Sequence, residues 1–372
     1  MERGTVCSRK NKKVFQSQKS LGACYGLASA ILFGLTTPCI KWFLPEVDLL
    51  PVAGLLYGGA GIGLGFFELI FKVMRPEGAI PSETPIQPAD RVLLVGIILT
   101  GGLLGPLLML YGLQRTSALV GSLLLNLEAP LTVLLAVTLF REHLGIREIG
   151  ATMCIFGGAG LLSYGPGVIS AHGVGIISII GACACWAIDN NLTQRLSLRN
   201  PLAVARVKGL SAGGFALGLA WLLNQNFPDA AAIGLLMGLG FVGYGVSVVL
   251  DIYALRLLGA AREAAFFATA PFIGAVAVVP LLGEHWTPKD YGAAAIMALG
   301  VGFLLQEHHR HMHTHPEMAH DHIHTHPDPH HEHEHEEDEF VGSHAHWHRH
   351  LPLHHDHAHV SDLHHRHEHK PY

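Results

Sequence analysis

The fourth long apolar stretch of the chain carries polar groups that could bind a solute. Asn126 and Glu128 lie two residues apart near its middle, and Pro130 follows. Proline has no amide hydrogen, so a carbonyl one turn upstream loses its helical partner. The carboxylate, the amide and this carbonyl could together bind a cation, an amine or a proton. Buried charges usually serve a function, although Glu128 could instead be a structural partner of Lys208 or Arg206.

A second polar cluster is Asp189-Asn190-Asn191, in the sixth apolar stretch. Three consecutive residues cannot share one helical face, so at least one of them must point to a cavity or to another helix. Trp186 precedes the cluster and reads as an interfacial anchor. The alternative is that Trp186 lines the same pathway.

Other ionisable residues in the apolar stretches favour structural roles. Asp251 lies close to Arg256 and Arg262, and either arginine could be its partner. Glu68 and Lys72 are four residues apart, a spacing that favours a local ion pair on a helix.

The C-terminal segment is dominated by histidine, because 25 of the 28 histidines follow Glu307. Most occur as His-x-His or His-His. Neutral imidazoles suit zinc, nickel and cobalt. The predicted metal ligands are His311, His313, His315, His320, His322, His324, His326, His331, His333, His335, His344, His346, His348, His350, His355, His357 and His359.

This tail, residues 307–372, has few apolar side chains and is expected to be disordered. Three roles stay open: a collector that feeds or senses metal for export, a passive metal store, or a pH-responsive segment, since histidines titrate together near neutrality. The apolar stretches themselves lack histidine, which favours an organic solute over a metal ion as cargo.

The elements that must position these groups are long apolar helices. The chain is 50% hydrophobic and only 14% charged, whereas soluble domains carry roughly 25% charged residues. Stretches of about 18 residues or more can cross a bilayer. Helices are predicted at about 21–43, 49–72, 91–113, 116–140, 146–164, 173–195, 202–224, 230–255, 260–282 and 288–306.

Basic residues between these stretches predict the orientation. With a cytoplasmic N-terminus, 15 lysines and arginines lie at inside ends and three at outside ends. This bias agrees with the positive-inside rule for a multi-pass protein of the cell membrane. Ten spans return the chain to its starting side, so the basic leader (1–20) and the tail are both expected in the cytoplasm.

The membrane part contains an internal duplication. Glu142-His143 recurs as Glu284-His285, and Pro130 corresponds to Pro271. Each half, 21–164 and 173–306, then holds five spans, and an odd number forces the halves into opposite orientations. The predicted fold is an all-α integral membrane protein of about ten helices in two inverted repeats. Glu142 and Glu284 lie at span ends and are interpreted as markers of the fold.

These motifs resemble the EamA-type proteins of the drug/metabolite transporter superfamily. The first helix has Phe33-Gly34 followed by Pro38 and Lys41, and the fourth has a central proline and a Glu-His exit that the ninth repeats. Arg141 stands where the family usually has glycine. The resemblance covers about residues 20–306. It implies a carrier of small metabolites, commonly outward, without identifying the substrate.

Together these features predict a secondary exporter of a small organic metabolite. The first alternative is an efflux transporter for divalent nickel, cobalt or zinc, and the second is a metal sensor or scaffold that does not transport. The sequence shows no enzyme motif, requires no cofactor and does not suggest nucleic-acid binding. The expected partners are the lipid bilayer and a small-molecule substrate, and small residues on the spans permit a homodimer.

Overall fold

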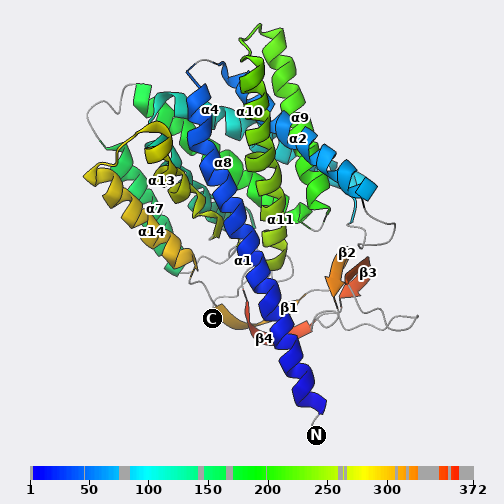
Figure 1. The fold of residues 1–372 in the computed structure, drawn as a ribbon. Coiled ribbons are helices and arrows are strands. Elements are labelled where there is room, and N and C mark those ends of the chain that lie inside the picture. The colour runs from blue at the N-terminus through cyan, green and yellow to red at the C-terminus, as the bar shows by residue number, and fades with distance from the viewer. Residues whose placement is uncertain are drawn as a thin grey trace.

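A bundle of helices and a small region of strands make up the protein (Figure 1). The computed structural model describes residues 3–45, 47–74, 84–140, 146–164, 171–197, 199–258, 263, 266–305, 309–315, 318–325, 343–350 and 353–359. Regular structure before residue 306 is helical in the described ranges, as the apolar composition predicts.

The first half of the bundle contains α1 (Arg3–Phe43), α2 (Leu49–Met74), η1 (Pro88–Asp90), α3 (Arg91–Ile97), η2 (Ile98–Leu104), α4 (Gly105–Arg115), α5 (Ala118–Leu124), η3 (Leu125–Leu127), α6 (Glu128–Phe140) and α7 (Ile146–Ser163). The second half contains α8 (Ala171–Leu196), α9 (Pro201–Leu222), α10 (Ala230–Gly240), η4 (Phe241–Val246), α11 (Ser247–Leu258), α13 (Ala270–Leu282) and α14 (Pro288–Leu305).

Seven helical segments within the described residues are long and apolar enough to cross a bilayer. Two shorter apolar helices, Ile149–Ser163 and Ala270–Leu282, accompany them. Described helical residues occur in each of the ten predicted ranges, but fewer meet the length and hydropathy expected of a span. The protein is therefore a multi-pass membrane protein, and the count of ten spans stays a prediction.

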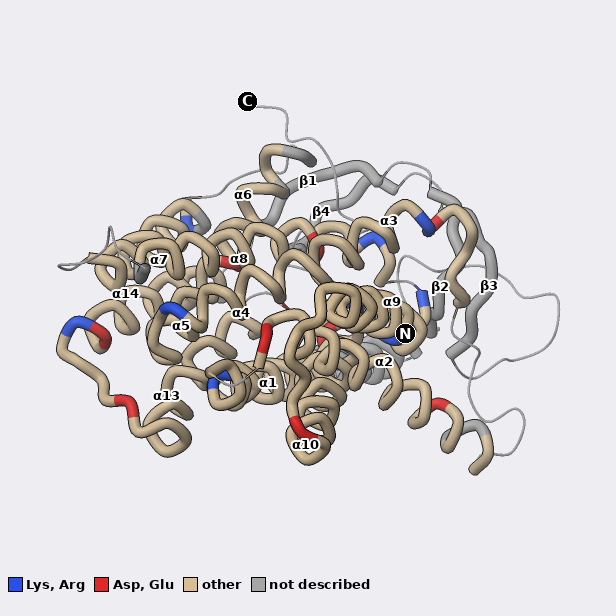
Figure 2. Tube along the Cα trace, turned by 90° about the horizontal axis from the view of Figure 1, so that it is seen from above, with Lys and Arg blue, Asp and Glu red and all other residues tan. Residues whose placement is uncertain are grey.

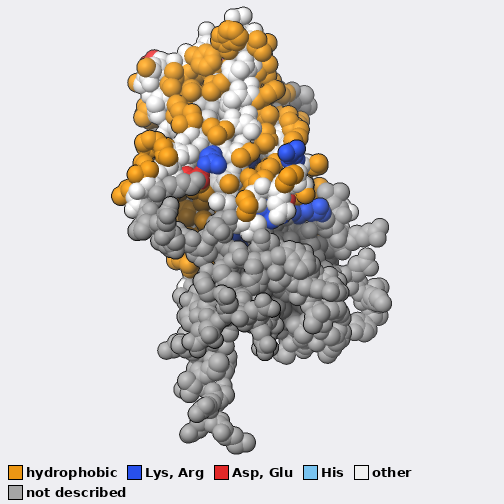
Figure 3. All heavy atoms as spheres, turned by 90° about the vertical axis from the view of Figure 1, so that its right-hand side faces the viewer, with side chains coloured by type: hydrophobic (Ala, Val, Ile, Leu, Met, Phe, Trp, Pro, Cys, Tyr) orange, Lys and Arg blue, Asp and Glu red, His pale blue; other side chains and the backbone are white. Residues whose placement is uncertain are grey.

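The outer surface of the bundle is apolar. Hydrophobic side chains cover most of the upper face in Figure 3, while lysine and arginine gather toward its lower edge. Large hydrophobic side chains such as Phe66, Phe215 and Trp221 are each more than half exposed. Charged positions are sparse along the helices seen from above (Figure 2). Such a belt suits contact with lipid chains.

The two halves pack in a reciprocal manner. Helix α2 contacts α9, and α7 contacts α14, so corresponding helices pair directly. Other major contacts occur in matched sets: α4 packs on α8 as α11 packs on α1, and α8 on α6 as α1 on α13. These contacts are exchanged with one another when the halves are exchanged, as expected for a duplication.

Both halves also carry a π-helical segment at the same place. Segment η2 precedes α4 in the first half, and η4 precedes α11 in the second. Such π-helical insertions in α-helices are often found at functional sites. Because the insertion occurs in both repeats, the middle of the third and eighth predicted spans is a candidate functional region.

Close approach of α2 and α9 depends on glycine. A Cβ atom on Gly213 would collide with the backbone of Gly58, and one on Gly209 would lie 2.8 Å from the amide nitrogen of Gly61. Backbone cannot move aside as a flexible side chain can, so small residues let these two helices meet.

Polar side chains connect helix ends, both between the halves and within the first half. The Glu284 carboxylate accepts hydrogen bonds from the amides of Ala118 (2.9 Å) and Leu119 (3.0 Å), at the start of α5. These amides have no partner within their own helix, and a negative group is favourable there. Lys41 donates to the carbonyls of Leu113 and Thr116 at the end of α4. Glu284 therefore has a structural role; Glu142 lies outside the described residues.

The tail forms strands β1 (His309–His315), β2 (Met318–Thr325), β3 (Ser343–His350) and β4 (Leu353–His359). They lie at the same end of the molecule as the N-terminal part of α1 (Figure 1). Composition alone predicts disorder for the tail as a whole, and this stays a prediction, while the described tail residues pair as strands. The His-x-His repeat has the two-residue period of a strand, and pairing satisfies the backbone groups.

Strand pairing in the tail places histidines opposite one another. Antiparallel β1 and β4 pair His309 with His359, His311 with His357 and His313 with His355. Strands β2 and β3 pair His320 with His348, His322 with His346 and His324 with His344. The predicted ligands His326, His331, His333 and His335 lie outside the described residues.

The α2–α9 crossing yields a matched pair of test substitutions. Gly213→Ala should lower stability by about 1–3 kcal/mol, the cost of overpacking a tight contact. Gly214→Ala is the control, since a Cβ there meets nothing within 4 Å. Thermal unfolding of both variants in detergent measures the difference. Equal melting temperatures would contradict the tight crossing.

Candidate functional site

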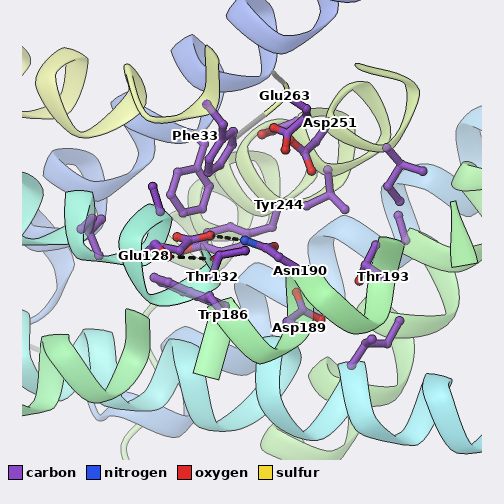
Figure 4. Close-up of a pocket in the computed structure, with 18 of the residues that line it drawn as sticks. Phe33, Glu128, Thr132, Trp186, Asp189, Asn190, Thr193, Tyr244, Asp251 and Glu263 are labelled. Carbon is purple, nitrogen blue, oxygen red and sulfur yellow. Dashed lines mark hydrogen bonds between the residues drawn. The ribbon is translucent and has the colours of Figure 1, made fainter. Parts of the chain in front are cut away.

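A pocket lies between the two halves of the bundle (Figure 4). The space between its lining atoms is about 1060 Å³, a volume that includes the open space at its mouth. Its polar and aromatic lining residues are Phe33, Tyr57, Asn126, Glu128, Thr132, Trp186, Asp189, Asn190, Thr193, Lys208, Tyr244, Ser247, Asp251, Glu263 and Phe267.

Glu128 reaches the pocket because the fourth predicted span is interrupted. The 3₁₀ turn η3 separates α5 from α6, and Glu128 is the first residue of α6. Pro130 follows at a position where it cannot donate to the preceding turn. Pro130 is buried and is absent from the pocket lining, so it shapes the break and does not reach the cavity.

A hydrogen bond joins Glu128 to the sixth predicted span. Asn190 Nδ2 donates to Glu128 Oε1 over 2.7 Å, and Thr132 Oγ1 donates to the Glu128 carbonyl over 2.9 Å (Figure 4). Asn191 does not line the pocket; its amide donates to the carbonyls of Ala187 and Thr132. The pocket thus contains two members of the predicted Asp-Asn-Asn cluster, and the third holds α8 to α6.

Lys208 forms an ion pair with Asp189. Its Nζ lies 2.6 Å from Asp189 Oδ2, and both side chains are buried. The alternative that Glu128 pairs with Lys208 or Arg206 is wrong, because Lys208 is held by Asp189 and Arg206 contacts Glu68 on α2. The Lys72 side chain, proposed as the partner of Glu68, lies outside the described residues.

The π-helical segment η2 leaves the Gly101 carbonyl without a partner in its own helix. The amide of Gly105 donates to Thr100, and Pro106 has no amide hydrogen, so neither serves Gly101. Tyr57 Oη and Trp186 Nε1 donate to this carbonyl instead, over 2.6 and 3.3 Å. Trp186 is only 6% exposed. Its interpretation as an interfacial anchor is wrong, because its indole nitrogen finds its partner inside the bundle.

A glycine of η2 also makes room for the carboxyl group of Asp189. A Cβ on Gly101 would collide with the carboxyl group of Asp189, so only glycine admits Asp189 at this depth. The matching residue of the second π-helical segment, Gly243, meets the hydroxyl of Thr36 in the same way. The two halves share this geometry but differ in charge.

Aromatic rings crowd one side of the pocket. Phe33 lies 5.2 Å from Phe267, 5.7 Å from Tyr244 and 6.0 Å from Trp186, measured between ring centroids. Tyr57 lies 5.1 Å from Tyr244. The two halves contribute to this group together.

Several polar atoms at the pocket lack a hydrogen-bond partner. Asn126 donates through Nδ2 to the carbonyl of Leu123, but its Oδ1 is buried and unpartnered. Asp189 and Thr193 interact with each other, and Asp189 Oδ1 and Thr193 Oγ1 are buried and have no further partner. Buried polar groups are almost always satisfied, so these atoms fit a site that holds a ligand or water.

Sequence reasoning misplaced Asp251 and missed Glu263. Their carboxyl groups lie next to each other at the pocket wall (Figure 4). Arg256, proposed as the partner of Asp251, donates to the carbonyls of Ser197 and Arg199; Arg262 lies outside the described residues. The sequence did offer one indication of Glu263, because an acidic residue within a predicted span (260–282) is unusual.

The aromatic residues Tyr57 and Tyr244 gave no signal, because aromatic side chains in apolar helices usually belong to the core. Among the described side chains, which exclude the tail, no cluster of three or more histidine, cysteine, aspartate or glutamate groups could hold a metal ion. Of the three histidines before the tail, the side chain of His285 alone is described, and it is exposed.

Comparison with known proteins explains the paired architecture. A family profile described as the EamA-like transporter family matches residues 20–164 and again residues 173–306. The chain belongs to the EamA-like transporter family. Each match covers one half of the bundle, so the pocket of this EamA-type transporter lies where its two repeats meet.

A relative in Methanothermobacter thermautotrophicus, described as an uncharacterized transporter, is 27% identical over 291 residues. The alignment covers 75% of this chain and 84% of the relative. A solved crystal structure has a TM-score of 0.56 at 17% identity, covering 76% of this chain and 94% of its own. The structural likeness supports the fold alone, and the family supports a membrane transporter.

The ion pair between Asp189 and Lys208 should be essential for stability. Asp189→Asn leaves Lys208 buried without its direct ion-pair partner, and losing one partner of a buried pair costs about 3–5 kcal/mol. The double variant Asp189→Asn, Lys208→Met removes the uncompensated charge and should recover part of this loss. Thermal unfolding of the purified transporter checks the cycle, and additive losses would argue against the pair.

Proposed function

We propose that this EamA-type transporter is a secondary carrier for a small organic solute with a positively charged group. The solute binds in the pocket between the repeats. The carrier has ten spans in two inverted repeats in the cell membrane, and both termini are cytoplasmic. The unbalanced charge of the pocket carries this proposal.

The described lining residues include four carboxyl groups but one ammonium group. Lys208 is paired with Asp189, which leaves Glu128, Asp251 and Glu263 without a cationic partner among the described side chains. Buried charges are stable only when they are compensated. A cationic solute entering the pocket would supply the missing charge, whereas an anionic one would add to the repulsion.

The aromatic group supports the same class of solute. An ammonium ion within about 6 Å of an aromatic face is attracted by the ring. Phe33, Trp186, Tyr244 and Phe267 line the pocket next to the carboxyl groups. A small organic amine can contact rings and acid at once, and its apolar part can replace water at the remaining walls.

The architecture supports alternating access. Inverted repeats commonly place the substrate between interrupted helices near the bilayer midplane and open it to each side by rocking one repeat against the other. In this carrier the interruptions before Pro130 and Pro271 both border the pocket. The sequence has no nucleotide-binding motif, so a gradient would drive transport, and the family resemblance favours export.

Glu128→Gln tests the pocket. Removing the charge should weaken uptake of radiolabelled tetraethylammonium into proteoliposomes about 10-fold to 100-fold, the effect of losing a charged interaction of about 1.5–3 kcal/mol. Concentration dependence of the initial rate is the measurement.

Glu68→Gln is the matched control, because Glu68 contacts Arg206 and does not line the pocket. Uptake should be unchanged in this variant. Labelled succinate, an anion, should not be transported by either protein. Equal uptake by the wild type and Glu128→Gln would reject the pocket as the cation site.

We also propose that the tail binds zinc, nickel or cobalt. Paired histidines recur at every second position of both strand pairs, and alternate residues of a strand share one face. Neighbouring pairs could therefore supply four imidazoles to one ion, a common arrangement for these metals. This observation keeps metal efflux and metal sensing as alternatives to a tail that stores metal.

Removal of residues 307–372 separates these alternatives. The truncated protein should lose nickel binding in calorimetry but keep tetraethylammonium transport, because the pocket lies within residues 33–271. Cellular nickel, cobalt and zinc are then measured for both forms. Metal content lowered by the full-length protein and raised by Glu128→Gln would favour metal efflux over organic-cation transport.

A further inference from the structure

Two carboxyl groups meet at the pocket wall, at a place separate from the contact between Glu128 and Asn190. Asp251 lies on α11, and Glu263 lies between α11 and α13 (Figure 4). Glu263 is 8% exposed. Asp251 Oδ1 and Glu263 Oε1 are both buried, and the two carboxyl groups have no partner other than each other. A pair of acids in this state needs compensation that the described side chains do not provide.

The surrounding charges increase the need for a positive charge at Asp251 and Glu263. Lys208 on α9 attracts the Asp251 carboxylate, but its ammonium group is held 2.6 Å from Asp189. Asp189 on α8 and Glu128 on α6 add negative charge near the pair. From α1 and η4, the neighbouring lining residues are Phe33 and Tyr244, which carry no positive charge.

A proton fits this arrangement better than a metal ion. Two adjacent carboxylates repel each other, and one shared proton removes a charge and bridges their oxygens. Calcium takes about six to eight oxygen ligands and magnesium about six. Among the described side chains, no group of three or more histidine, cysteine, aspartate or glutamate residues is placed to hold a metal ion.

We propose that Asp251 and Glu263 together hold one exchangeable proton and form the coupling site of the carrier. This inference rests on the proposed transport of a cation through the pocket. The proton comes from water on one side of the membrane and forms an O–H bond with a carboxylate oxygen of the pair. On the other side this bond breaks and the proton returns to water.

Exchange follows from electrostatics. The proton and the cationic solute neutralise the same excess of carboxylates, so binding of either disfavours binding of the other. A carrier that reorients only when this charge is compensated then moves the solute in one direction and the proton in the other. Glu128 and Asn190 hold the solute, while Asp251 and Glu263 hold the proton.

Infrared spectroscopy of the purified full-length protein tests the proton site without any solute. Acid-minus-base difference spectra of the wild type should contain the C=O stretching band of a protonated carboxylic acid. Asp251→Asn and Glu263→Gln should each shift the pH at which this band appears, and the double variant should lose it. Glu68→Gln is the control and should keep it. A band that is unchanged in both single variants overturns the proposal.

Proton flux gives the second measurement. In proteoliposomes that contain a pH-sensitive dye, tetraethylammonium entry should drive proton exit, and the protons moved per tetraethylammonium should fall about tenfold or more in each single variant. Monodisperse elution of each variant in detergent shows that it is folded.

The two proposals fail in distinguishable ways. If tetraethylammonium is transported but its proton coupling survives both substitutions, the proton site is wrong and cation transport stands. If the infrared bands change as expected but the wild type does not transport tetraethylammonium, the proton site stands and the proposed solute class is wrong.

Discussion

Inside a membrane, a backbone amide or carbonyl without a partner cannot turn to water, and this constraint decides where the helices of this transporter can be interrupted. Pro130 and Pro271 each remove an amide hydrogen beside the pocket, and Pro106 does the same for the π-helical segment before α4. The carbonyl of Gly101 is satisfied by Tyr57 and Trp186. Interruptions are therefore placed where side chains, or a bound solute, can complete the hydrogen bonding.

The scarcity of water inside the membrane also determines how the charged side chains are arranged. Lys208 and Asp189 compensate each other, which ties α9 to α8, and Gly101 makes room for the acid. The carboxyl groups of Glu128, Asp251 and Glu263 all lie at the same cavity. Their repulsion is tolerable only if the cavity regularly contains positive charge, and this requirement links the structure to the proposed exchange of a cation and a proton.

Sequence patterns predicted the helical architecture, the duplication and the main polar groups well. Asn126, Glu128, Asp189 and Asn190 were identifiable because polar residues are conspicuous in apolar stretches, and the structure brings all four to one pocket. Partners were harder to predict. Spacing along a helix reveals only local neighbours, whereas the partner of Asp189 lies on the next helix along the chain.

Other features were beyond the reach of local patterns. Glu263 follows a basic residue near a predicted helix end, which suggests an ordinary surface ion pair. Tyr57 and Tyr244 are indistinguishable from core aromatic residues until the fold brings them together. In the tail, composition predicted disorder, while the alternating pattern also satisfies the requirements of a strand.

The matched glycines of the two repeats have a consequence for how a solute is oriented. Gly101 faces the carboxyl group of Asp189, but Gly243 faces the hydroxyl of Thr36. Two identical halves would hold any solute equally well in two poses related by rotation. An acid in only one half makes these poses unequal. The pocket can therefore distinguish the two ends of an elongated solute.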